Sequence, residues 1–439
     1  MLDRSWTRRE LLRIGGLSVL AGAVAPDWAC AAEGASRRRN CIFIMLQGGP
    51  SHVDLWDPKP AASAEIRGPF ATIKTAVPGI EFTEMLSGTA KVADRLCVIR
   101  SMTHKFTNHI AGTYIALTGS TIQQDRDREA HSDDFPGPGA VLNYLERQTP
   151  SVPRSVALPN WLSIPGPSNR MPGQYGGFLG SVFDPFAIEG DPAAADYRPL
   201  SLTMADGMTP DRLKGRLSLM KQLDTSARLV ERELNRRYDR LFESAYGLVA
   251  DGRVRRALDL NQEPPATRDR YGRTKFGQSL LLARRLVEAG VQFVAHNAFN
   301  LEWDTHGDLE RRYHQIVPPM DAAYSALVAD LAERGLLDDT LVINTGEFGR
   351  TPVINKGAGR DHWPNVYTTV LAGGGIRGGQ TVGASDSKAA EVASHPISPA
   401  DLLATMWRQL GISPATELHD RLNRPLRLSD GRVLEEQCA

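Results

Sequence analysis

The segment Asn344-Thr345-Gly346-Glu347-Phe348-Gly349-Arg350-Thr351-Pro352, followed by Gly359-Arg360-Asp361-His362-Trp363-Pro364-Asn365, carries the strongest structural signal in this chain of 439 residues. It lies between two apolar runs rich in β-branched residues, Thr340–Ile343 and Val366–Ala372. Such runs are typical of buried strands, and we expect both to be parallel to their neighbours. A connection of about twenty residues is long for a compact domain, and loops of that length are usually functional or disordered. In open α/β sheets ligands bind beyond the carboxyl ends of strands, so the segment predicts a functional site.

Acidic and imidazole side chains in this segment indicate a metal site. Glu347, Asp361 and His362 offer carboxylate oxygens and an imidazole nitrogen. These ligands suit Zn²⁺, Mn²⁺ or iron. The alternative is that Asp361 and His362 only cap a turn, and this stretch alone leaves both interpretations open.

Two other strand-like runs are followed by loops with similar side chains. The apolar run 41–46 precedes Gln47–Asp54, where two glycines permit close backbone approach to a ligand and Asp54 offers a carboxylate. The run 291–296 precedes Trp303–Asp308, in which Asp304 and His306 stand two residues apart. An ordinary turn is the alternative for the first loop. Because several loops at corresponding strand ends carry such residues, we expect a divalent metal ion, zinc first, with manganese, calcium or iron as alternatives.

Asn108 and His109 stand at the start of a predicted helix that runs to Gly119. Backbone N–H groups at a helix N-terminus favour anions, so a phosphate or sulfate group is one expected ligand there. The alternative is that Asn108 or Thr107 serves only as the helix N-cap.

Composition and charge restrict the class of partner. Lys+Arg and Asp+Glu are both 51, so no global field favours nucleic acid or an anionic membrane. An apolar content of 41% is normal for a globular protein with a full core.

The N-terminus has the pattern of an export signal. Thr7–Arg13 contains a twin-arginine pair, and the apolar run Ile14–Ala25 is too short to span a bilayer as a mature helix. Ala29-Cys30-Ala31 supplies small residues for cleavage. We therefore predict a signal peptide over 1–32, a linker over 33–40, a periplasmic or secreted location, and no membrane span in the mature protein. An uncleaved cytoplasmic N-terminus is the alternative.

The remaining sequence predicts one α/β domain over 41–439. Apolar strand-like runs alternate with helical patterns such as 276–289, 313–336 and 398–412. A region of about 160–260 reads as an insertion, and its second half, Thr209–Ala250, has long helical periodicity.

Five motifs together resemble the bacterial domain-of-unknown-function family 1501. They are Gln47–Asp54, Asp57–Pro60, Trp303–Asp308, Gly346–Pro352 and Gly359–Trp363. The resemblance runs from about Asn40 to the C-terminus, and the family is similar to the alkaline phosphatase and sulfatase superfamily. It implies a three-layer αβα sandwich around a mostly parallel sheet, with a helical insertion.

The resemblance also implies roles for individual residues. Asp304, His306 and His362 look like the ligands of one metal, and Asp54 is our substitute for the superfamily's first-strand aspartate. Glu347 stands where the superfamily usually has the Asp of an Asp-His pair, but Phe348 replaces the His. His109, with Asn108 beside it, falls at the place of the Ser, Thr or Cys nucleophile, so attack by metal-activated water is expected.

The function implied is an exported metal-dependent hydrolase of phosphate or sulfate esters. Arg350 is expected to pair with the anionic ester oxygens, and His109 to act as general acid/base or to anchor the anion. The alternative is a non-catalytic periplasmic protein on a degenerate sulfatase-like fold, which binds or assembles with partner proteins there.

Overall fold

The computed structural model describes residues 39–120, 129–146, 152–164, 170–197, 252–298 and 301–438. Contacts separate residues up to Arg38 from the unit Arg39–Ala439, and the fold described here belongs to that second unit. The predicted signal peptide 1–32, nearly all of the predicted linker, and the helical region Thr209–Ala250 lie outside the described residues.

An eight-stranded sheet forms the middle of the described fold. Its strands, in spatial order, are β12 (Gln380–Val382), β4 (Leu96–Met102), β11 (Tyr367–Ala372), β8 (Thr340–Thr345), β1 (Asn40–Met45), β7 (Phe293–Asn297), β5 (Ser155–Leu158) and β6 (Phe186–Ala187). The predicted strands over 41–46, 291–296 and 340–343 are confirmed, and they lie side by side near its centre.

Strand direction decides which loops meet at one edge. β7 and β8 both run parallel to β1, while β11 runs antiparallel to both of its neighbours, β8 and β4. The run 366–372 is a buried strand, as expected, but the expectation that it is parallel is wrong, because it points the opposite way from the strand that precedes the loop. As a result, β11 begins at the edge where β8, β1, β7 and β4 end.

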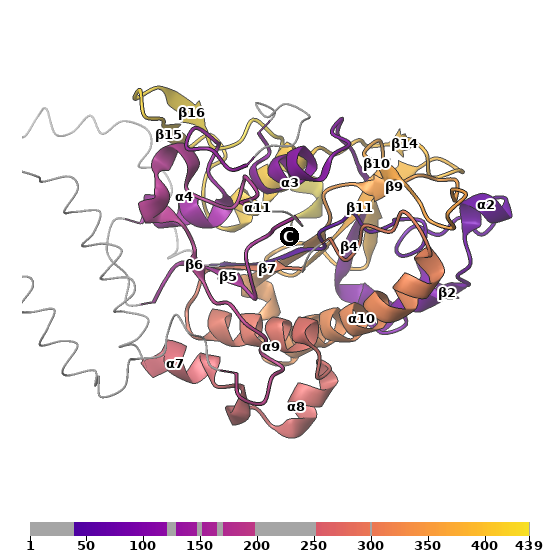
Figure 1. Cartoon of the computed structure of the whole chain (residues 1–439), viewed down its shortest axis with the longest axis horizontal. Helices are drawn as coiled ribbons and strands as arrows, with labels where there is room; N and C mark the ends of the chain where they lie inside the picture. The colour runs from indigo at the N-terminus through magenta and orange to yellow at the C-terminus, as the bar shows by residue number, and fades with distance from the viewer. Residues whose placement is uncertain are drawn as a thin grey trace, which may run out of the picture. The chain divides into compact units, whose positions relative to one another are not determined.

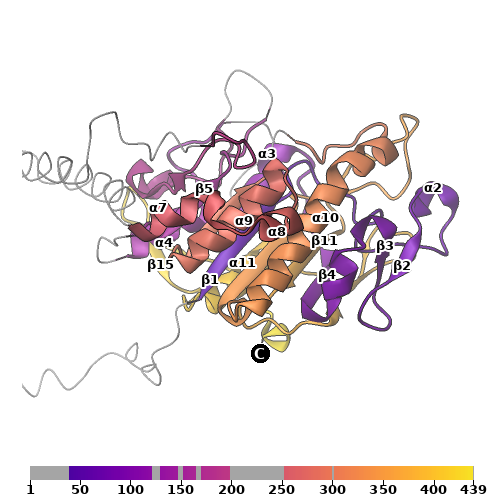
Figure 2. The same ribbon diagram turned by 90° about the horizontal axis from the view of Figure 1, so that it is seen from below.

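Two layers of helices cover the sheet (Figures 1 and 2). Ile42, Ile44 and Val342 pack in one apolar cluster with α9 (Lys275–Glu288) and α10 (Leu309–Glu333). Phe43 and Ile343, which alternate with them along the same strands, pack in a second cluster with other helices. These are α3 (His109–Thr118), α4 (Pro138–Leu145) and α11 (Pro399–Gln409). The predicted three-layer arrangement around a mostly parallel sheet is thus confirmed.

Smaller elements complete the described fold. Short helices are α2 (Ala64–Arg67), α7 (Gly252–Leu258) and α8 (Pro265–Arg270). Two-stranded ribbons pair β2 (Thr72–Lys74) with β3 (Glu81–Thr83), β9 (Gly349–Arg350) with β10 (His362–Trp363), β13 (Ala384–Ser385) with β14 (Val392–Ser394), and β15 (Glu417–His419) with β16 (Pro425–Arg427). The 3₁₀ turns are η2 (Glu84–Leu86), η3 (Thr89–Arg95), η4 (Gly177–Leu179), η5 (Ser181–Phe183), η7 (Leu260–Gln262), η8 (Leu337–Asp339) and η9 (Glu435–Gln437).

Within the described ranges, no helix combines the length and apolar character needed to cross a membrane.

Helix α11 begins with a capping box that should contribute to stability. The Ser398 hydroxyl accepts a hydrogen bond from the Asp401 backbone N–H, and the Asp401 carboxylate accepts one from the Ser398 backbone N–H. We expect Ser398→Ala to lower the free energy of unfolding by about 1 kcal/mol, because the first turn loses one acceptor. Chemical denaturation measures this change. Ser398→Thr keeps the acceptor and should lose much less; an equal loss in both variants would contradict the capping role.

Candidate functional site

Loops from five strands converge at one edge of the sheet. Met45 of β1 lies opposite both Asn297 of β7 and Thr345 of β8, so these three parallel strands end in the same row. At the same edge, Met102 at the end of β4 lies opposite Tyr367 at the start of β11. This edge therefore brings together the side chains that follow β1, β7, β8 and β4 and the side chains that precede β11.

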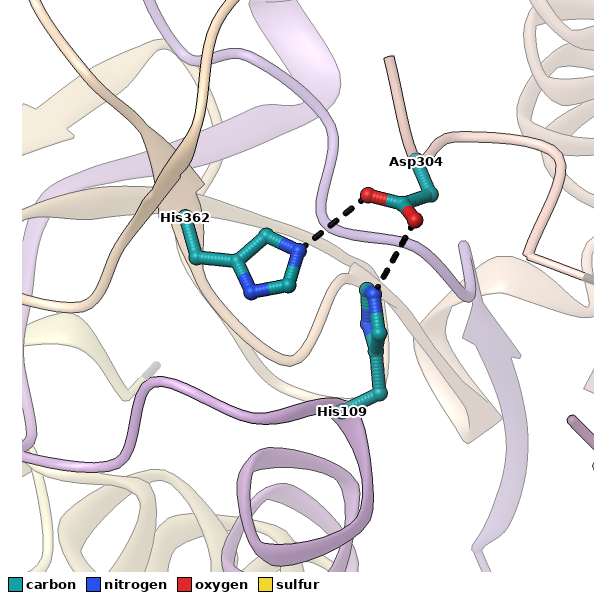
Figure 3. Close-up of side chains that lie close together, drawn as sticks. All are labelled: His109, Asp304 and His362. Atoms are coloured by element: carbon teal, nitrogen blue, oxygen red, sulfur yellow. Dashed lines mark hydrogen bonds and ion pairs between the residues drawn. The ribbon is translucent and has the colours of Figure 1, made fainter. Parts of the chain in front are cut away.

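Three of these side chains form the centre of the candidate site (Figure 3). Asp304, His109 and His362 each offer a ligand atom, and these atoms all lie within 4.8 Å of one another. Asp304 Oδ2 lies 3.3 Å from His109 Nε2, and Asp304 Oδ1 lies 3.1 Å from His362 Nε2. We call Asp304, His109, His362 and the adjoining His306 the histidine–aspartate cluster.

His306 joins this cluster at its solvent side. Its Nε2 lies 3.0 Å from Asp304 Oδ1 and 3.0 Å from His362 Nε2. The His306 side chain is 48% exposed, whereas that of His109 is 13% exposed. The cluster therefore opens to solvent on the side of His306 and is closed on the side of His109.

An oxygen lies next to the Nδ1 atom of each of the three imidazoles. His109 Nδ1 lies 2.7 Å from Glu347 Oε1, and His306 Nδ1 lies 2.7 Å from Asp361 Oδ1. His362 Nδ1 lies 2.6 Å from the Thr107 carbonyl oxygen. Because these oxygens accept hydrogen bonds, the Nδ1 atoms carry the protons. In the neutral imidazole each Nε2 then has a free lone pair directed toward Asp304, with which it can bind a shared cation.

The charges of the cluster are strongly coupled. Burial by itself lowers the pKa of His109, but hydrogen bonds to Asp304 and Glu347 outweigh burial and raise that pKa to about 9. Burial would raise the pKa of Asp304, yet His109, His362 and Arg350 together lower it well below its ordinary range. The hydrogen bond from His306 likewise lowers the pKa of Asp361. Without an ion, the cluster stabilises a protonated His109 next to ionised carboxylates.

The geometry of the cluster fits a divalent metal. Zinc–ligand bonds of about 2.0–2.1 Å at tetrahedral angles place neighbouring ligand atoms about 3.3 Å apart. The Asp304 carboxylate lies 3.0, 3.1 and 3.3 Å from His306, His362 and His109, and the Nε2 atoms of His306 and His362 lie 3.0 Å apart. Three imidazole nitrogens that point at one carboxylate with their lone pairs also need a shared cation, either protons or a metal. The donor set of imidazoles and one carboxylate suits zinc, manganese or iron.

Two of the predicted ligands, Glu347 and Asp361, contact imidazoles of the cluster on the side away from Asp304. Glu347 is fully buried, and its Oε1 accepts from the Gly48 N–H at 2.8 Å as well as facing His109. Asp361 faces His306 and also accepts from Asn355 Nδ2 at 3.2 Å. Both carboxylates are therefore placed to orient an imidazole rather than to stand in the first layer around an ion.

Asp54 lies outside the cluster, unlike the sequence expectation. Its two carboxylate oxygens accept from Arg360 Nε at 2.7 Å and Arg360 Nη2 at 3.1 Å. The Ser51 hydroxyl donates to the same carboxylate at 2.5 Å. All three side chains are fully buried, so this aspartate holds two loops together and we leave it out of the ligand set.

Arg350 and Asn108 also take other positions than the sequence suggested. The Arg350 side chain is 0% exposed and donates to Asp304 and to backbone carbonyls, so its guanidinium does not face an incoming substrate. Asn108 is the N-cap of α3, because its side-chain oxygen accepts from the Ala111 N–H at 2.8 Å. The capping alternative describes Asn108 better than a direct catalytic role.

Sequence reasoning missed the close approach of the loop after β1 to the site. Gly48 has φ +116°, and a Cβ atom there would lie 2.4 Å from the Asp304 backbone nitrogen. The glycine pair had predicted approach to a ligand, whereas it is protein backbone that approaches. The sequence shows Phe348 only as a phenylalanine at the place where the superfamily has a histidine. Its ring centroid lies 4.5 Å from that of His362 and 5.2 Å from that of His109, so it packs beneath the cluster.

Comparison with protein families assigns most of the chain. Residues 38–438 match the family model described as "Protein of unknown function (DUF1501)". A comparison with curated protein sequences finds no match.

Solved structures with a similar chain path include three hydrolytic or synthetic enzymes. The PsFucS1 sulfatase from Pseudoalteromonas sp. is 13% identical, with 93% of this chain and 72% of that chain covered and a TM-score of 0.39. A phosphonate monoester hydrolase of Agrobacterium radiobacter is 12% identical, with 91% and 77% covered and a TM-score of 0.38. The lipoteichoic acid synthase LtaP from Listeria monocytogenes is 10% identical, with 87% and 74% covered and a TM-score of 0.37. Likenesses this low carry no information about function.

The tight contact at Gly48 generates a prediction. We expect Gly48→Ala to destabilise the protein by more than the roughly 1–2 kcal/mol that a left-handed backbone costs an L-residue, because its Cβ would also clash with the backbone of Trp303 and Asp304. Gly290→Ala is the matched control, since Gly290 has φ +102° with nothing within 4 Å of the added Cβ. Unfolding in denaturant compares the two variants. Equal losses would show that the backbone contact is unimportant.

Proposed function

This chain belongs to the DUF1501 family, and we propose that it is a metal-dependent hydrolase of phosphate or sulfate esters. One observation carries the proposal. Three imidazoles, each with Nδ1 facing an oxygen, direct Nε2 toward the single carboxylate of Asp304. Metal-ligating histidines almost always have such a partner on the second ring nitrogen. The ligand atoms of Asp304, His109 and His362 also all lie within 4.8 Å of one another, as sharing one ion requires.

The residues proposed to hold the ion are Asp304, His362, His306 and His109. When bound, a divalent metal supplies Lewis acidity that polarises an ester oxygen and lowers the pKa of a bound water. Asp304 is central because all three imidazoles contact its two oxygens. Glu347 and Asp361 hold His109 and His306 in the tautomer that leaves Nε2 unprotonated.

The exposure of the cluster indicates how a substrate reaches it. His306 and Asp361 are 48% and 54% exposed, whereas Glu347, behind His109, is 0% exposed. An ester therefore approaches from the side of His306 and Asp361. Because Arg350 does not face this opening, we propose that the imidazoles and the ion, rather than an arginine fork, meet the anionic oxygens. In the metal-free protein a proton is held on His109 Nε2, and this proton would have to leave before the atom could bind the ion.

We also propose that the protein is exported before it acts. The support is the twin-arginine pair within Thr7–Arg13, the short apolar run after it and the small residues at 29–31. The proposed location is the periplasm or the exterior, with no nucleic acid as partner, because positive and negative charges balance.

The first test is of the metal and the chemistry together. We expect the purified mature protein to contain a divalent metal and to hydrolyse at least one aryl phosphate or aryl sulfate, with loss of activity in EDTA and recovery on adding Zn²⁺ or Mn²⁺. Asp304→Asn and His362→Ala should each weaken metal affinity by more than the roughly 10–100-fold effect of losing an outer partner. Inductively coupled plasma analysis and competition with a chromophoric chelator measure the metal.

His419→Ala is the matched control, because His419 is an exposed histidine of the β15–β16 ribbon. It should leave metal content and turnover unchanged. A protein that binds its metal through Asp304 and His362 but hydrolyses no ester of a broad panel would be a metal-dependent binding protein. That outcome would refute the hydrolase.

The pH dependence of metal binding follows from the raised pKa of His109. An ordinary histidine has a pKa near 6.5, and His109 in the metal-free fold has a pKa of about 9, so its Nε2 carries a proton between these values. Ion pairing of this imidazolium stabilises the metal-free protein below pH 6.5, and this contribution disappears as the pH rises through 9. Because the metal must displace the proton, metal affinity should rise with pH up to about 9 and then level off.

Calorimetry in two buffers of different ionisation enthalpy measures the protons released at pH 7. We expect about one proton from His109 per metal ion bound, and His109→Gln should remove that share. Metal affinity that does not change between pH 6.5 and 9 would contradict the placement of His109 in the ligand set.

A further inference from the structure

One four-residue segment touches three members of the histidine–aspartate cluster. Glu347 faces His109 Nδ1 at 2.7 Å, the Phe348 ring packs 4.5 Å from the ring of His362, and Arg350 Nη2 donates to Asp304 Oδ1 at 2.7 Å. We propose that the segment Glu347–Arg350 positions the cluster as one unit, and that Arg350 is a positioning residue that acts through Asp304. This inference rests on the metal site of the proposed function.

The contacts of Arg350 explain why it cannot serve a substrate. Its Nε donates to the Gly49 carbonyl at 2.8 Å, and its Nη1 donates to the Arg360 carbonyl at 3.0 Å. Its Nη2 is shared among the carbonyls of Gly48 and Trp303 and the Asp304 carboxylate. The side chain is 0% exposed. Every nitrogen of the fork therefore has a partner inside the protein.

These partners come from three different loops. Gly48 and Gly49 follow β1, Trp303 and Asp304 follow β7, and Arg360 precedes β10. A planar guanidinium with donors in fixed directions sets the spacing of all three loops at once. The position of the Asp304 carboxylate is thus determined by a group on the loop after β8.

Arg350 is also coupled to His362 through the backbone. The two residues lie directly opposite each other in the antiparallel β9–β10 ribbon. A shift of the Arg350 backbone therefore moves His362, while a shift of its side chain moves Asp304. Two members of the cluster depend on this one residue by independent routes.

The charge of Arg350 has a definite effect on Asp304. Asp304 Oδ1 accepts from Arg350 at 2.7 Å and lies 3.0 and 3.1 Å from His306 and His362. A buried positive charge at this distance holds the carboxylate in place and fixes its plane. The carboxylate then does not have to reorganise when a cation is bound.

Arg360 supplies a matched comparison on the same loops. Its side chain is also 0% exposed, and it donates to Asp54, Ile66 and Thr351. Within the part of the chain that the structure describes, the Arg360 side chain makes no hydrogen bond or ion pair with a member of the cluster. A substitution here disturbs the same part of the fold without touching Asp304.

The experiment compares Arg350→Lys with Arg360→Lys. Lysine keeps the charge but loses the fork, so both variants should lose thermal stability. We expect Arg350→Lys to weaken metal affinity by roughly 10–100-fold, as for loss of an outer partner of a metal ligand, and Arg360→Lys to leave it within about threefold. Millimolar guanidinium should restore metal affinity to Arg350→Ala, and the visible spectrum of the Co²⁺-loaded protein should change in Arg350→Lys alone. Equal loss of metal affinity in the two lysine variants, or none in Arg350→Lys, would overturn the positioning role.

A measurement on the wild-type protein covers the case in which these variants do not fold. The arginine side-chain Nε–H signals in nuclear magnetic resonance should show Arg350 shifting when Zn²⁺ is added and Arg360 unchanged. If wild-type protein binds no metal, the proposed function fails. If it binds metal while the Arg350 signal stays in place, the metal site stands and the positioning role is refuted.

Discussion

The ion pair between buried Arg350 and partly buried Asp304 is the contact on which the arrangement of the site depends. Asp304 Oδ1 accepts from Arg350 Nη2 at 2.7 Å, and the same carboxylate faces three imidazoles. Removing two charges from water costs several kcal/mol per ion unless the remaining donors and acceptors are also satisfied. Here backbone carbonyls from separate loops satisfy the arginine. The pair is therefore stable only if these loops are correctly assembled, which couples the site to the whole carboxyl edge of the sheet.

The antiparallel strand β11 is what adds His362 to this edge. Strands β1, β4, β7 and β8 run in the same direction, so the segments that follow them lie at this edge. These segments contain Gly48, His109, Asp304 and Glu347. Because β11 runs in the opposite direction, the segment that precedes it lies at the same edge. The long loop between β8 and β11 thus begins and ends at one edge. Its two ends, Glu347–Arg350 and Asp361–His362, meet as the β9–β10 ribbon.

Backbone strain accompanies the loops that hold the cluster. Leu301, Asp308 and Ala358 all have positive φ angles, between 49° and 56°, although none is glycine. Each such residue costs about 1–2 kcal/mol. Backbone hydrogen bonds between the two loops offset the cost, with Asp308 donating to Gly357 and Leu309 to Ala358. Strain of this kind collects at functional sites, where the surrounding structure enforces it.

Local sequence patterns were sufficient to predict the central strands, some helix boundaries and the loops that form the candidate site. The β-branched runs gave the central strands, since a strand buried on both faces must be continuously apolar. Helix boundaries at Gly119 and Ser398 followed from capping chemistry. Such patterns do not distinguish helix types in short segments, and Met85–Asp94 forms parts of two 3₁₀ turns where an α-helix of the same length would have a similar sequence.

The sequence by itself determined that Asp304, His306, Glu347 and His362 stand beyond strand ends, because residue order and apolar runs are local properties. Only the tertiary structure decided their different roles. Whether a carboxylate faces an ion, an imidazole or an arginine depends on which residue approaches it from a loop 46 to 306 positions away along the chain. Asp54 meets Arg360, Glu347 meets His109 and Asp304 meets Arg350. The direction of β11 and the packing of the loops set these pairings, and no pattern of neighbouring residues encodes them.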